Sequence, residues 1–498
     1  MKFSDVIDRY LPPVIVAAVA AMLFSQTRHY GLMGFDSYPI IAASRIESLA
    51  DLYGTFSEKL MDGRYAGDFY RPLVNLTFAA DHMLWGLYAL GYQLTNVLLL
   101  GAWSVALHAL LRRLLGPRSR VGPLAGVLVF MLSALQFEVL PVPARRADLL
   151  CGLFMVLALW LQLSPRTLAS RKPSLGPAVA TLLALGSKET AFVLPILIVA
   201  VVALYSDRTT LRDRMRHAAT AVAPHIAAVV LITVARFAIL GGIGGHRSLS
   251  LVEIGRGVPR ALGLIATGLV WPQAPMRTNF DVWLLVVLAL GLLATAIWVS
   301  GLARDRRATR TLWGVVLGVV WVVLLSVTYA AAGQIGPWYF LLPLVGWALC
   351  SGSLVEALVT YARIKDRVLR TVAVTTLALF AVQLIWQAGF SPIVRHYDEW
   401  ERATSVSDAF LNESESLIVN ASPGSVVDAP PLPNWVLTSS ERPAIRGAAI
   451  LADYSVQAWA DLTLADRNVR VISGQADPPE EPEPDEILLR ITNRLEGY

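Results

Sequence analysis

The sequence predicts an all-α polytopic membrane protein with a small polar domain at its C-terminus. Of its 498 residues, 55% are hydrophobic and only 16% are charged, whereas soluble domains carry about 25% charged residues. Long apolar runs recur over residues 1–390, and they are continuous rather than alternating, which excludes an outer-membrane barrel. Residues 391–498 are polar, with acidic and proline-rich stretches and short strand-like pieces at 416–420 and 469–473, so we expect a separate extracytoplasmic domain of α/β or irregular structure there.

The apolar runs predict about eleven transmembrane helices. Run 11–24 is expected to be an uncleaved first span, because Asp5 and Asp8 are not typical of a signal peptide. Segment 258–271 is flanked by prolines and shorter than the ~20 residues of a span, so we expect it to be re-entrant or interfacial. The other expected spans are 89–111, 121–135, 149–163, 175–186, 191–205, 217–240, 282–302, 312–330, 339–360 and 371–390.

Basic residues cluster in every second connection between these expected spans. Cytoplasmic loops carry an excess of Lys and Arg, so this spacing places the N-terminus in the cytoplasm and the 30–88 connection outside, together with the C-terminal domain. The net charge of +5 follows from these clusters, and no nucleic-acid partner is predicted. The clusters are Lys2/Arg9, Arg112/Arg113/Arg118/Arg120, Arg166/Arg171/Lys172, Arg208/Arg212/Arg214/Arg216, Arg304/Arg306/Arg307/Arg310 and Arg363/Lys365/Arg367/Arg370.

The first external connection, 30–88, is long and polar in an otherwise apolar chain, and connections of this length are usually functional or disordered. Asp36 follows the first span closely. A carboxylate at this position can act as a general base toward a hydroxyl where its surroundings raise its basicity; the alternative is an ordinary solvated acid. Segment 73–88 is expected to form an amphipathic helix along the membrane surface, with Trp85 at the interface.

Two further external features combine aromatic or acidic residues with arginines. Tyr70 and Arg71 precede a proline, where they fix the loop or contact a phosphate; a simple interfacial anchor is the alternative. Arg145, Arg146 and Asp148 lie at the edge of an apolar run, a few residues after Glu138. Arginine suits bidentate binding of phosphate oxygens, although a local Arg–Asp pair that orders the turn would look the same.

The last two features lie on the same predicted face. Lys188 and Glu189 stand between two apolar runs, where the lysine is suited to neutralise a phosphate and the glutamate to pair with an arginine; a capped helix start is the alternative. Tyr339 ends an aromatic segment that we interpret as part of the same site; a plain aromatic belt at the membrane interface is the alternative. Together the features indicate a substrate with a phosphate head at the interface and a lipid tail in the bilayer.

The ordered set of these motifs resembles the GT-C superfamily of polyprenyl-phosphate-sugar-dependent glycosyltransferases. Within it, the chain is most similar to the membrane part of protein O-mannosyltransferases that carry transmembrane and tetratricopeptide-repeat regions, although the repeats are absent. The motifs cover roughly residues 30–345. They are Phe35-Asp36, Tyr70-Arg71-Pro72-Leu73, Asn75-Leu76-Thr77-Phe78, the run 91–99, Glu138, Arg146-Ala147-Asp148-Leu149-Leu150, Ser187-Lys188-Glu189-Thr190 and the run 338–343.

The resemblance implies a GT-C-like helical bundle that performs an inverting transfer of a sugar from a polyprenyl-phosphate carrier to an acceptor hydroxyl outside the membrane. It implies Asp36 as general base, Asp148 as a second site acid, and Arg145 or Arg146 with Lys188 for the lipid phosphate. Many relatives have two adjacent acids in the first loop, whereas Ser37 takes the second place here. Relatives in the mannosyltransferase branch need no metal, so no metal or other cofactor is expected.

Two other functions remain open from the sequence: a transporter or flippase for a lipid-linked or polar substrate, and a non-catalytic membrane scaffold. A transporter would show internal repeats and helices broken near mid-membrane, and the sequence shows no convincing repeat. The sugar and the acceptor, whether protein, lipid or glycan, are not specified by the sequence. The plasma membrane is the expected location, because residues 495–498 carry no retention signal.

Overall fold

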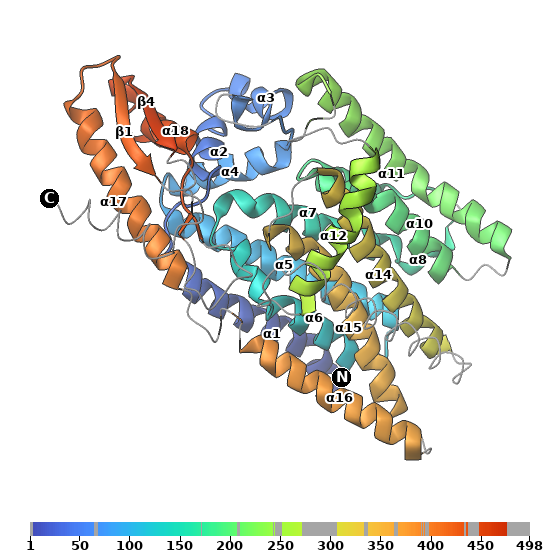
Figure 1. Ribbon diagram of the computed structural model, residues 1–498. Helices are drawn as coiled ribbons and strands as arrows, with labels where there is room; N and C mark the ends of the chain where they lie inside the picture. The colour runs from blue at the N-terminus through green and yellow to red at the C-terminus, as the bar shows by residue number, and fades with distance from the viewer. Residues whose placement is uncertain are drawn as a thin grey trace.

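The computed structural model describes residues 3–63, 68–170, 172–206, 210–242, 244, 251–270, 306–332, 337–362, 367–389, 391, 393, 398–432, 435–436 and 448–475. The expected span 282–302, residues 334–336 before the aromatic segment and the acidic stretch 478–485 lie outside these residues. Figure 1 shows a helical bundle, with the C-terminal segment against one end of it. The all-α polytopic fold class predicted from the sequence is therefore confirmed.

Among the described residues, five helices are long and apolar enough to cross a membrane by length and composition. The chain is thus a multi-pass membrane protein, and the expected total of about eleven spans stays a prediction. Further apolar helices of 10–17 residues lie at Val121–Met131, Leu175–Leu185, Glu189–Tyr205 and Ala373–Val382. The five long ones fall within α1 (Phe3–Thr27), α5 (Ala89–Leu115), α11 (Leu211–Leu240), α14 (Arg306–Ala332) and the η5–α15 segment (η5 Pro337–Phe340, α15 Leu341–Tyr361).

The centre of the bundle is built by close packing of helices. α15 packs against α14 and against α6 (Val121–Met131), while α7 (Arg146–Gln162) packs against α5 and α9 (Leu175–Leu185). Gly318 of α14 faces Gly346 of α15 so closely that a Cβ on either glycine would meet the other's carbonyl oxygen at 2.4 or 2.5 Å. Without a strong hydrophobic drive between helices in lipid, such small residues allow the backbones to make van der Waals contact.

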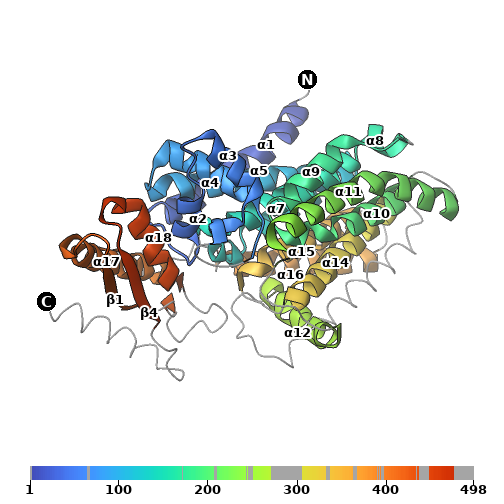
Figure 2. The same ribbon diagram turned by 90° about the horizontal axis from the view of Figure 1, so that it is seen from above.

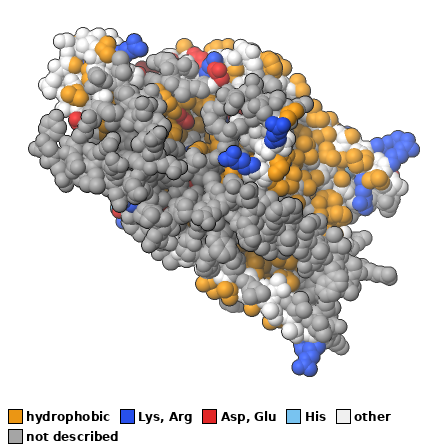
Figure 3. Space-filling model, viewed as in Figure 1, with side chains coloured by type: hydrophobic (Ala, Val, Ile, Leu, Met, Phe, Trp, Pro, Cys, Tyr) orange, Lys and Arg blue, Asp and Glu red, His pale blue; other side chains and the backbone are white. Residues whose placement is uncertain are grey.

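The outer face of the bundle is apolar. Figure 3 shows hydrophobic side chains over α10 (Leu194–Tyr205) and α11, with basic side chains at the edge of this area. On α11, Val230, Leu231 and Val234 are each more than half exposed. Side chains of this kind on a spanning helix are in contact with lipid rather than water.

The 30–88 connection differs from the expected loop because it is largely helical. It forms α2 (Ser37–Ala43), α3 (Leu49–Ser57), η1 (Leu60–Gly63) and α4 (Pro72–Trp85). A capping box of Ser48 and Asp51 starts α3, and Pro72 occupies the first position of α4, where its missing N–H costs nothing. α4 agrees with the amphipathic helix expected over 73–88: its end exposes Met83 and Leu84, while Phe78 is buried.

The expected length of one apolar segment needs correction. The apolar piece at 258–271 is not short, because it belongs to the 20-residue helix α12 (Leu251–Val270), which continues through Pro259 and packs on α14. Its first turn is too polar to be recognised as part of an apolar run. The remaining helices of the bundle are α8 (Pro165–Ala169) and α16 (Arg367–Ala388), with the short turns η2 (Ala134–Glu138), η3 (Pro143–Arg145) and η4 (Glu189–Val193).

The C-terminal segment is a small α/β unit. It contains α17 (Asp398–Asn420), β1 (Val426–Leu432), β2 (Trp435–Val436), β3 (Ala448–Ala449), α18 (Asp453–Thr463), η6 (Ala465–Arg467) and β4 (Arg470–Gln475). β1 pairs in parallel with β4, beginning at Val426 opposite Arg470, and β2 pairs antiparallel with β3. The strand predicted at 469–473 is confirmed as part of β4, whereas the one predicted at 416–420 is wrong, since those residues end α17.

The α/β unit lies against the helices of the 30–88 connection rather than apart from the bundle. α18 packs on α2, and the two are adjacent in Figures 1 and 2. Parallel strands need a crossover, and α18 lies on the crossover between β1 and β4. One buried apolar cluster continues from the bundle into this unit, from Trp103 and Phe130 to Trp400 and Val456.

Candidate active site

Asp36 lies at the start of α2, in a backbone that is held from two sides. Gly34 has φ +89°, and a Cβ there would meet Cγ1 of Val142 at 2.3 Å, so only glycine fits. The Gly34 N–H donates to the carbonyl of Ile450 at 2.7 Å. The Ser37 hydroxyl accepts from the N–H of Ala144 at 3.4 Å. The segment that carries Asp36 is therefore fixed against both the turn before α7 and the C-terminal unit.

The C-terminal unit also contacts the Asp36 carboxylate directly. The Tyr454 hydroxyl of α18 donates to Asp36 Oδ1 at 2.7 Å. The neighbouring Ser455 hydroxyl donates to the carbonyl of Phe35. Two consecutive residues of α18 thus position the acid that the sequence indicates as a general base. Sequence reasoning missed Tyr454, because nothing near residue 454 relates it to a residue 418 positions earlier.

Arg145 directly follows Ala144, whose N–H donates to Ser37, the residue after Asp36. It donates to the carbonyl of Glu138, and its guanidinium lies 4.6 Å from the ring centre of Trp338. Burial lowers the pKa of Arg145, while the negative potentials of Glu138, Asp148, Tyr339 and Asp36 oppose that shift. Asp36 and Asp148, the two acids named from the sequence, therefore both act electrostatically on the Arg145 guanidinium.

Asp148 and Lys188 form a buried ion pair beside Tyr339. Lys188 Nζ donates to both oxygens of Asp148 at 2.7 Å, and the ammonium lies 4.9 Å from the ring centre of Tyr339. The two side chains are 3% and 8% exposed. Asp148 stands in the first turn of α7 and Lys188 immediately precedes η4, so the pair ties these two elements together.

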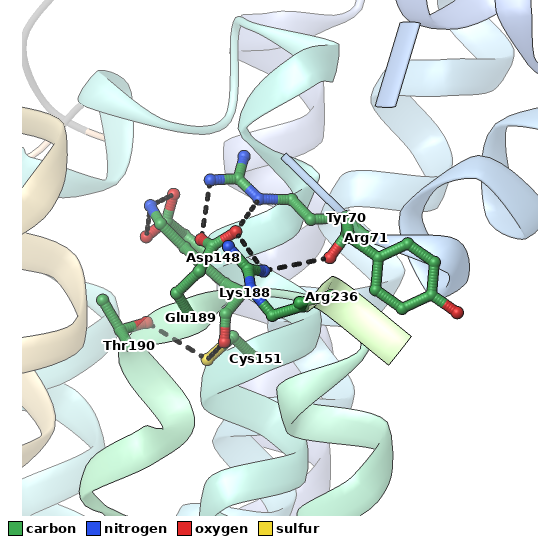
Figure 4. Close-up of polar contacts among 8 residues, drawn as sticks. All are labelled: Tyr70, Arg71, Asp148, Cys151, Lys188, Glu189, Thr190 and Arg236. Carbon is green, nitrogen blue, oxygen red and sulfur yellow. Dashed lines mark hydrogen bonds and ion pairs between the residues drawn. The ribbon is translucent and has the colours of Figure 1, made fainter. Parts of the chain in front are cut away.

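Glu189 is shared by two arginines, as Figure 4 shows. Its Oε2 accepts from Arg71 at 2.9 Å, and its Oε1 accepts from Arg236 of α11 at 2.9 Å. Two guanidinium groups against one carboxylate leave one positive charge in excess within this triad. Asp148 and Tyr339 also act electrostatically on Arg71, so the triad adjoins the Asp148–Lys188 pair. Arg236 was not identified from the sequence, although a lone arginine within the run 217–240 is itself a signal of a functional or paired charge.

Two predicted site residues point elsewhere. Arg146 is fully buried and bonds to Asp81 at 2.5 Å and Asn96 at 2.9 Å, with its guanidinium 4.4 Å from the ring centre of Phe78. The Tyr70 hydroxyl donates to the carbonyl of Phe56, and only the Tyr70 carbonyl faces the cluster, where it accepts from Arg236 at 3.4 Å. Figure 4 shows the Tyr70 ring turned away from the charged residues. We therefore assign neither side chain to substrate binding.

The structure thus brings Asp36, Arg145, Asp148, Lys188, Arg71, Glu189 and Tyr339 together at one end of the bundle. Among the described residues, no group of three His, Cys, Asp or Glu side chains is placed to hold a metal ion. Both cysteines are free and buried, and Cys151 Sγ lies 3.4 Å from the hydroxyl of Thr190 beneath the cluster. The arrangement offers one carboxylate near solvent and several cations suited to an anionic group.

Comparison with known proteins agrees with the resemblance. No family model matches the sequence. Over 175 residues the chain is 28% identical to protein O-mannosyl-transferase TMTC4 of Homo sapiens and 27% identical to its Mus musculus counterpart. Each match covers 31% of this chain but only 23% and 24% of those proteins. The predicted likeness to protein O-mannosyltransferases is confirmed over this stretch, and the chain spans about a quarter of the relatives' length.

Two crystal structures of ArnT from Cupriavidus metallidurans also overlap with the chain. The one bound to undecaprenyl phosphate gives a TM-score of 0.46 at 15% identity, and the one in the apo state gives 0.43 at 13%. Each overlap covers 92% of this chain and 89% of the other. Scores of this size do not establish a shared fold.

Arg145 and Arg146 are adjacent in sequence but are expected to respond differently to substitution. Arg146→Met should lower the free energy of unfolding by about 3–5 kcal/mol, because it leaves Asp81 charged and unpaired in a buried site. Arg145→Met removes a guanidinium whose ion-pair distance to Glu138 is 3.8 Å and should destabilise less. Thermal unfolding in detergent measures both changes, and equal destabilisation by the two variants would contradict this division.

Glu138 is expected to make the protein less stable as the pH rises. Burial raises its pKa to about 7; Arg145 opposes the shift and Glu399 of α17 adds to it. A carboxyl group with a raised folded-state pKa stabilises the fold below its unfolded pKa, and this contribution is lost as the pH passes the folded value. The melting temperature should fall between about pH 5 and about pH 8, and the fall should be smaller in Glu138→Gln. The exposed Glu47→Gln serves as control, and an equal pH dependence in both variants would contradict the assignment.

Proposed function

We propose that the chain is an integral-membrane inverting glycosyltransferase. It moves a sugar from a polyprenyl-phosphate carrier to an acceptor hydroxyl of a protein, lipid or glycan on the extracytoplasmic side, in a membrane that we propose is the plasma membrane. The observation that carries the proposal is the contact of the Asp36 segment with the turn that carries Arg145, through the hydrogen bond from the Ala144 N–H to Ser37, near a triad with excess positive charge. The likeness to protein O-mannosyl-transferase TMTC4 over 175 residues supports it.

In the proposed reaction Asp36 accepts the proton of the acceptor hydroxyl. Tyr454 donates to Oδ1 of this carboxylate and helps to orient it. The acceptor oxygen then forms a bond to the anomeric carbon, while the bond from that carbon to the phosphate oxygen breaks. This single displacement inverts the configuration. The departing polyprenyl phosphate gains one negative charge.

The cations stabilise that departing phosphate. Arg145 and Arg71 supply planar guanidinium groups, which suit phosphate oxygens, and Lys188 supplies a point charge. Asp148 holds Lys188 with both oxygens, so we assign it to positioning the lysine rather than to proton transfer. Tyr339 contacts the same lysine through its ring. Fixed charges at the position where negative charge develops lower the barrier without reorganisation during the reaction.

The proposal is tested by sugar transfer in reconstituted liposomes. Wild type and Asp36→Asn are each given radiolabelled polyprenyl-phosphate sugars, with membrane extract as acceptor. We expect wild type to release the lipid phosphate and Asp36→Asn to be slower by roughly 10²–10⁴-fold, the usual contribution of a general base. Asp68→Asn is the matched control, because Asp68 is exposed and pairs with Lys59 on the surface of the same external region. Equal turnover of wild type and Asp36→Asn would remove Asp36 from the mechanism; absence of turnover by folded wild type with every donor would contradict the proposed activity.

Tyr454 is expected to position Asp36 and to favour its charged form. Tyr454→Phe removes a hydrogen bond to a carboxylate, a bond of about 1.5–3 kcal/mol, so kcat should fall about tenfold while the KM for the donor changes little. Without this donor the acidic limb of the pH–rate profile should shift to higher pH, because a donated hydrogen bond stabilises the carboxylate. Tyr53→Phe, at an exposed position of α3, is the control. If the pH profile of Tyr454→Phe matches that of wild type, the positioning role is wrong.

A further inference from the structure

A cavity with a basic lining lies far from the Asp36 site. Its volume is about 840 Å³, and it opens among the ends of α5, α7, α8, α10 and α14, which Figure 1 shows away from α2 and α18. Asn96, near the start of α5, bonds to Arg146 beside the candidate active site, whereas Arg112 lies in the last turn of the same helix. At 1.5 Å per residue the two levels are roughly 24 Å apart along α5.

The described lining of this cavity is basic and contains no carboxylate. Arg112 and Arg113 come from α5, and Arg310 comes from α14. Arg113 donates to the carbonyl of Trp160, and its guanidinium lies 3.8 Å from the ring centre of that residue. None of the three arginines forms an ion pair with a carboxylate among the residues that the structure describes. The cavity therefore concentrates positive charge that these residues do not compensate.

Helix electrostatics account for only part of this arrangement. Cations in the last turn of a helix are stabilised by its dipole, which is a sufficient reason for Arg112 and Arg113. Arg310 lies near the N-terminal end of α14, where a cation gains nothing from the dipole. Its guanidinium nevertheless approaches α5, since a Cβ on Gly116 would lie 2.9 Å from Arg310 Nη1. An anionic ligand between the two helices gives this convergence a physical reason.

The remaining lining residues indicate what kind of anion fits. Leu163, Leu168 and Ala109 place apolar surface beside the arginines, and Trp160 and Tyr205 add amphipathic rings. A cavity of about 840 Å³ is far larger than one phosphate group needs. Basic pockets between transmembrane helices bind the head groups of anionic lipids, and guanidinium groups suit phosphate oxygens.

We propose that this cavity binds the phosphate of an anionic organic compound, with Arg112 and Arg310 as its principal ligands and the less polar part of the compound against Leu163 and Leu168. The site is independent of the reaction at Asp36, because it concerns binding at the other end of the bundle. A phosphate of this kind can come from a lipid head group or from a soluble phosphate compound.

The test measures binding to the whole chain in detergent. Native mass spectrometry detects the complex, and tryptophan fluorescence reports on the cavity because Trp160 lines it. The probes are dihexanoyl phosphatidylglycerol, dihexanoyl phosphatidylcholine and glycerol phosphate. We expect phosphatidylglycerol to bind wild type more tightly than phosphatidylcholine. If phosphatidylglycerol binds more tightly than glycerol phosphate, the site is a lipid site. If the two anionic probes bind equally, the same phosphate site belongs to a soluble compound.

Variants separate this site from general attraction to a basic surface. Arg112→Gln with Arg310→Gln should weaken phosphatidylglycerol binding by about tenfold or more, since charge-assisted hydrogen bonds are the strong ones. Arg310→Gln alone, at an exposed position, should give a partial loss and guards against a double variant that does not fold. Arg118→Gln removes an equal charge from an exposed position nearby that does not line the cavity, and should bind as wild type does. Equal loss in Arg118→Gln, or no binding by wild type, would overturn the proposal.

Discussion

The pairing of buried charges at one end of the bundle is the constraint on which the rest of the site depends. Asp148 and Lys188 are almost fully buried, and so is Arg236. Each would be costly there alone, because removing a charge from water is repaid only by close partners. The partners come from different helices, so satisfying them fixes the starts of α4, α7 and η4 against α11. The charges thus position the helices as much as the helices position the charges.

This network has a different character from the surroundings of Asp36. The charged side chains of this network pair with one another, yet the triad of Arg71, Arg236 and Glu189 keeps one positive charge in excess. Asp36 accepts a hydrogen bond from Tyr454 of the C-terminal unit. In the proposed reaction the bundle therefore supplies the phosphate-binding charge, and the C-terminal unit orients the base. The two requirements of the reaction, cations and a positioned carboxylate, are met by separate parts of the chain.

The sequence was most informative where charges interrupt apolar runs. Lys188, Glu189 and Asp148 were identifiable because ionisable residues at a membrane rim need a reason. The sequence did not show whether Arg145 or Arg146 faces the site, because the answer depends on where a turn ends. η3 ends at Arg145 and α7 begins at Arg146, so the two side chains point in different directions. Apart from the helix expected over 73–88, the 30–88 connection was expected to be a loop, and α2, α3 and η1 were missed because they are short.

Tyr454 shows why the remaining part of the site lay beyond sequence reasoning. Its position follows from a chain of structural facts: β1 pairs in parallel with β4, a parallel pair requires a crossover, and the crossover includes α18. α18 then buries one face against α2, which brings Tyr454 to Asp36. None of these steps has a local sequence signal, since each depends on a contact between distant segments. A polar segment distant in sequence can therefore complete the candidate site, because its fold places one hydroxyl against the carboxylate.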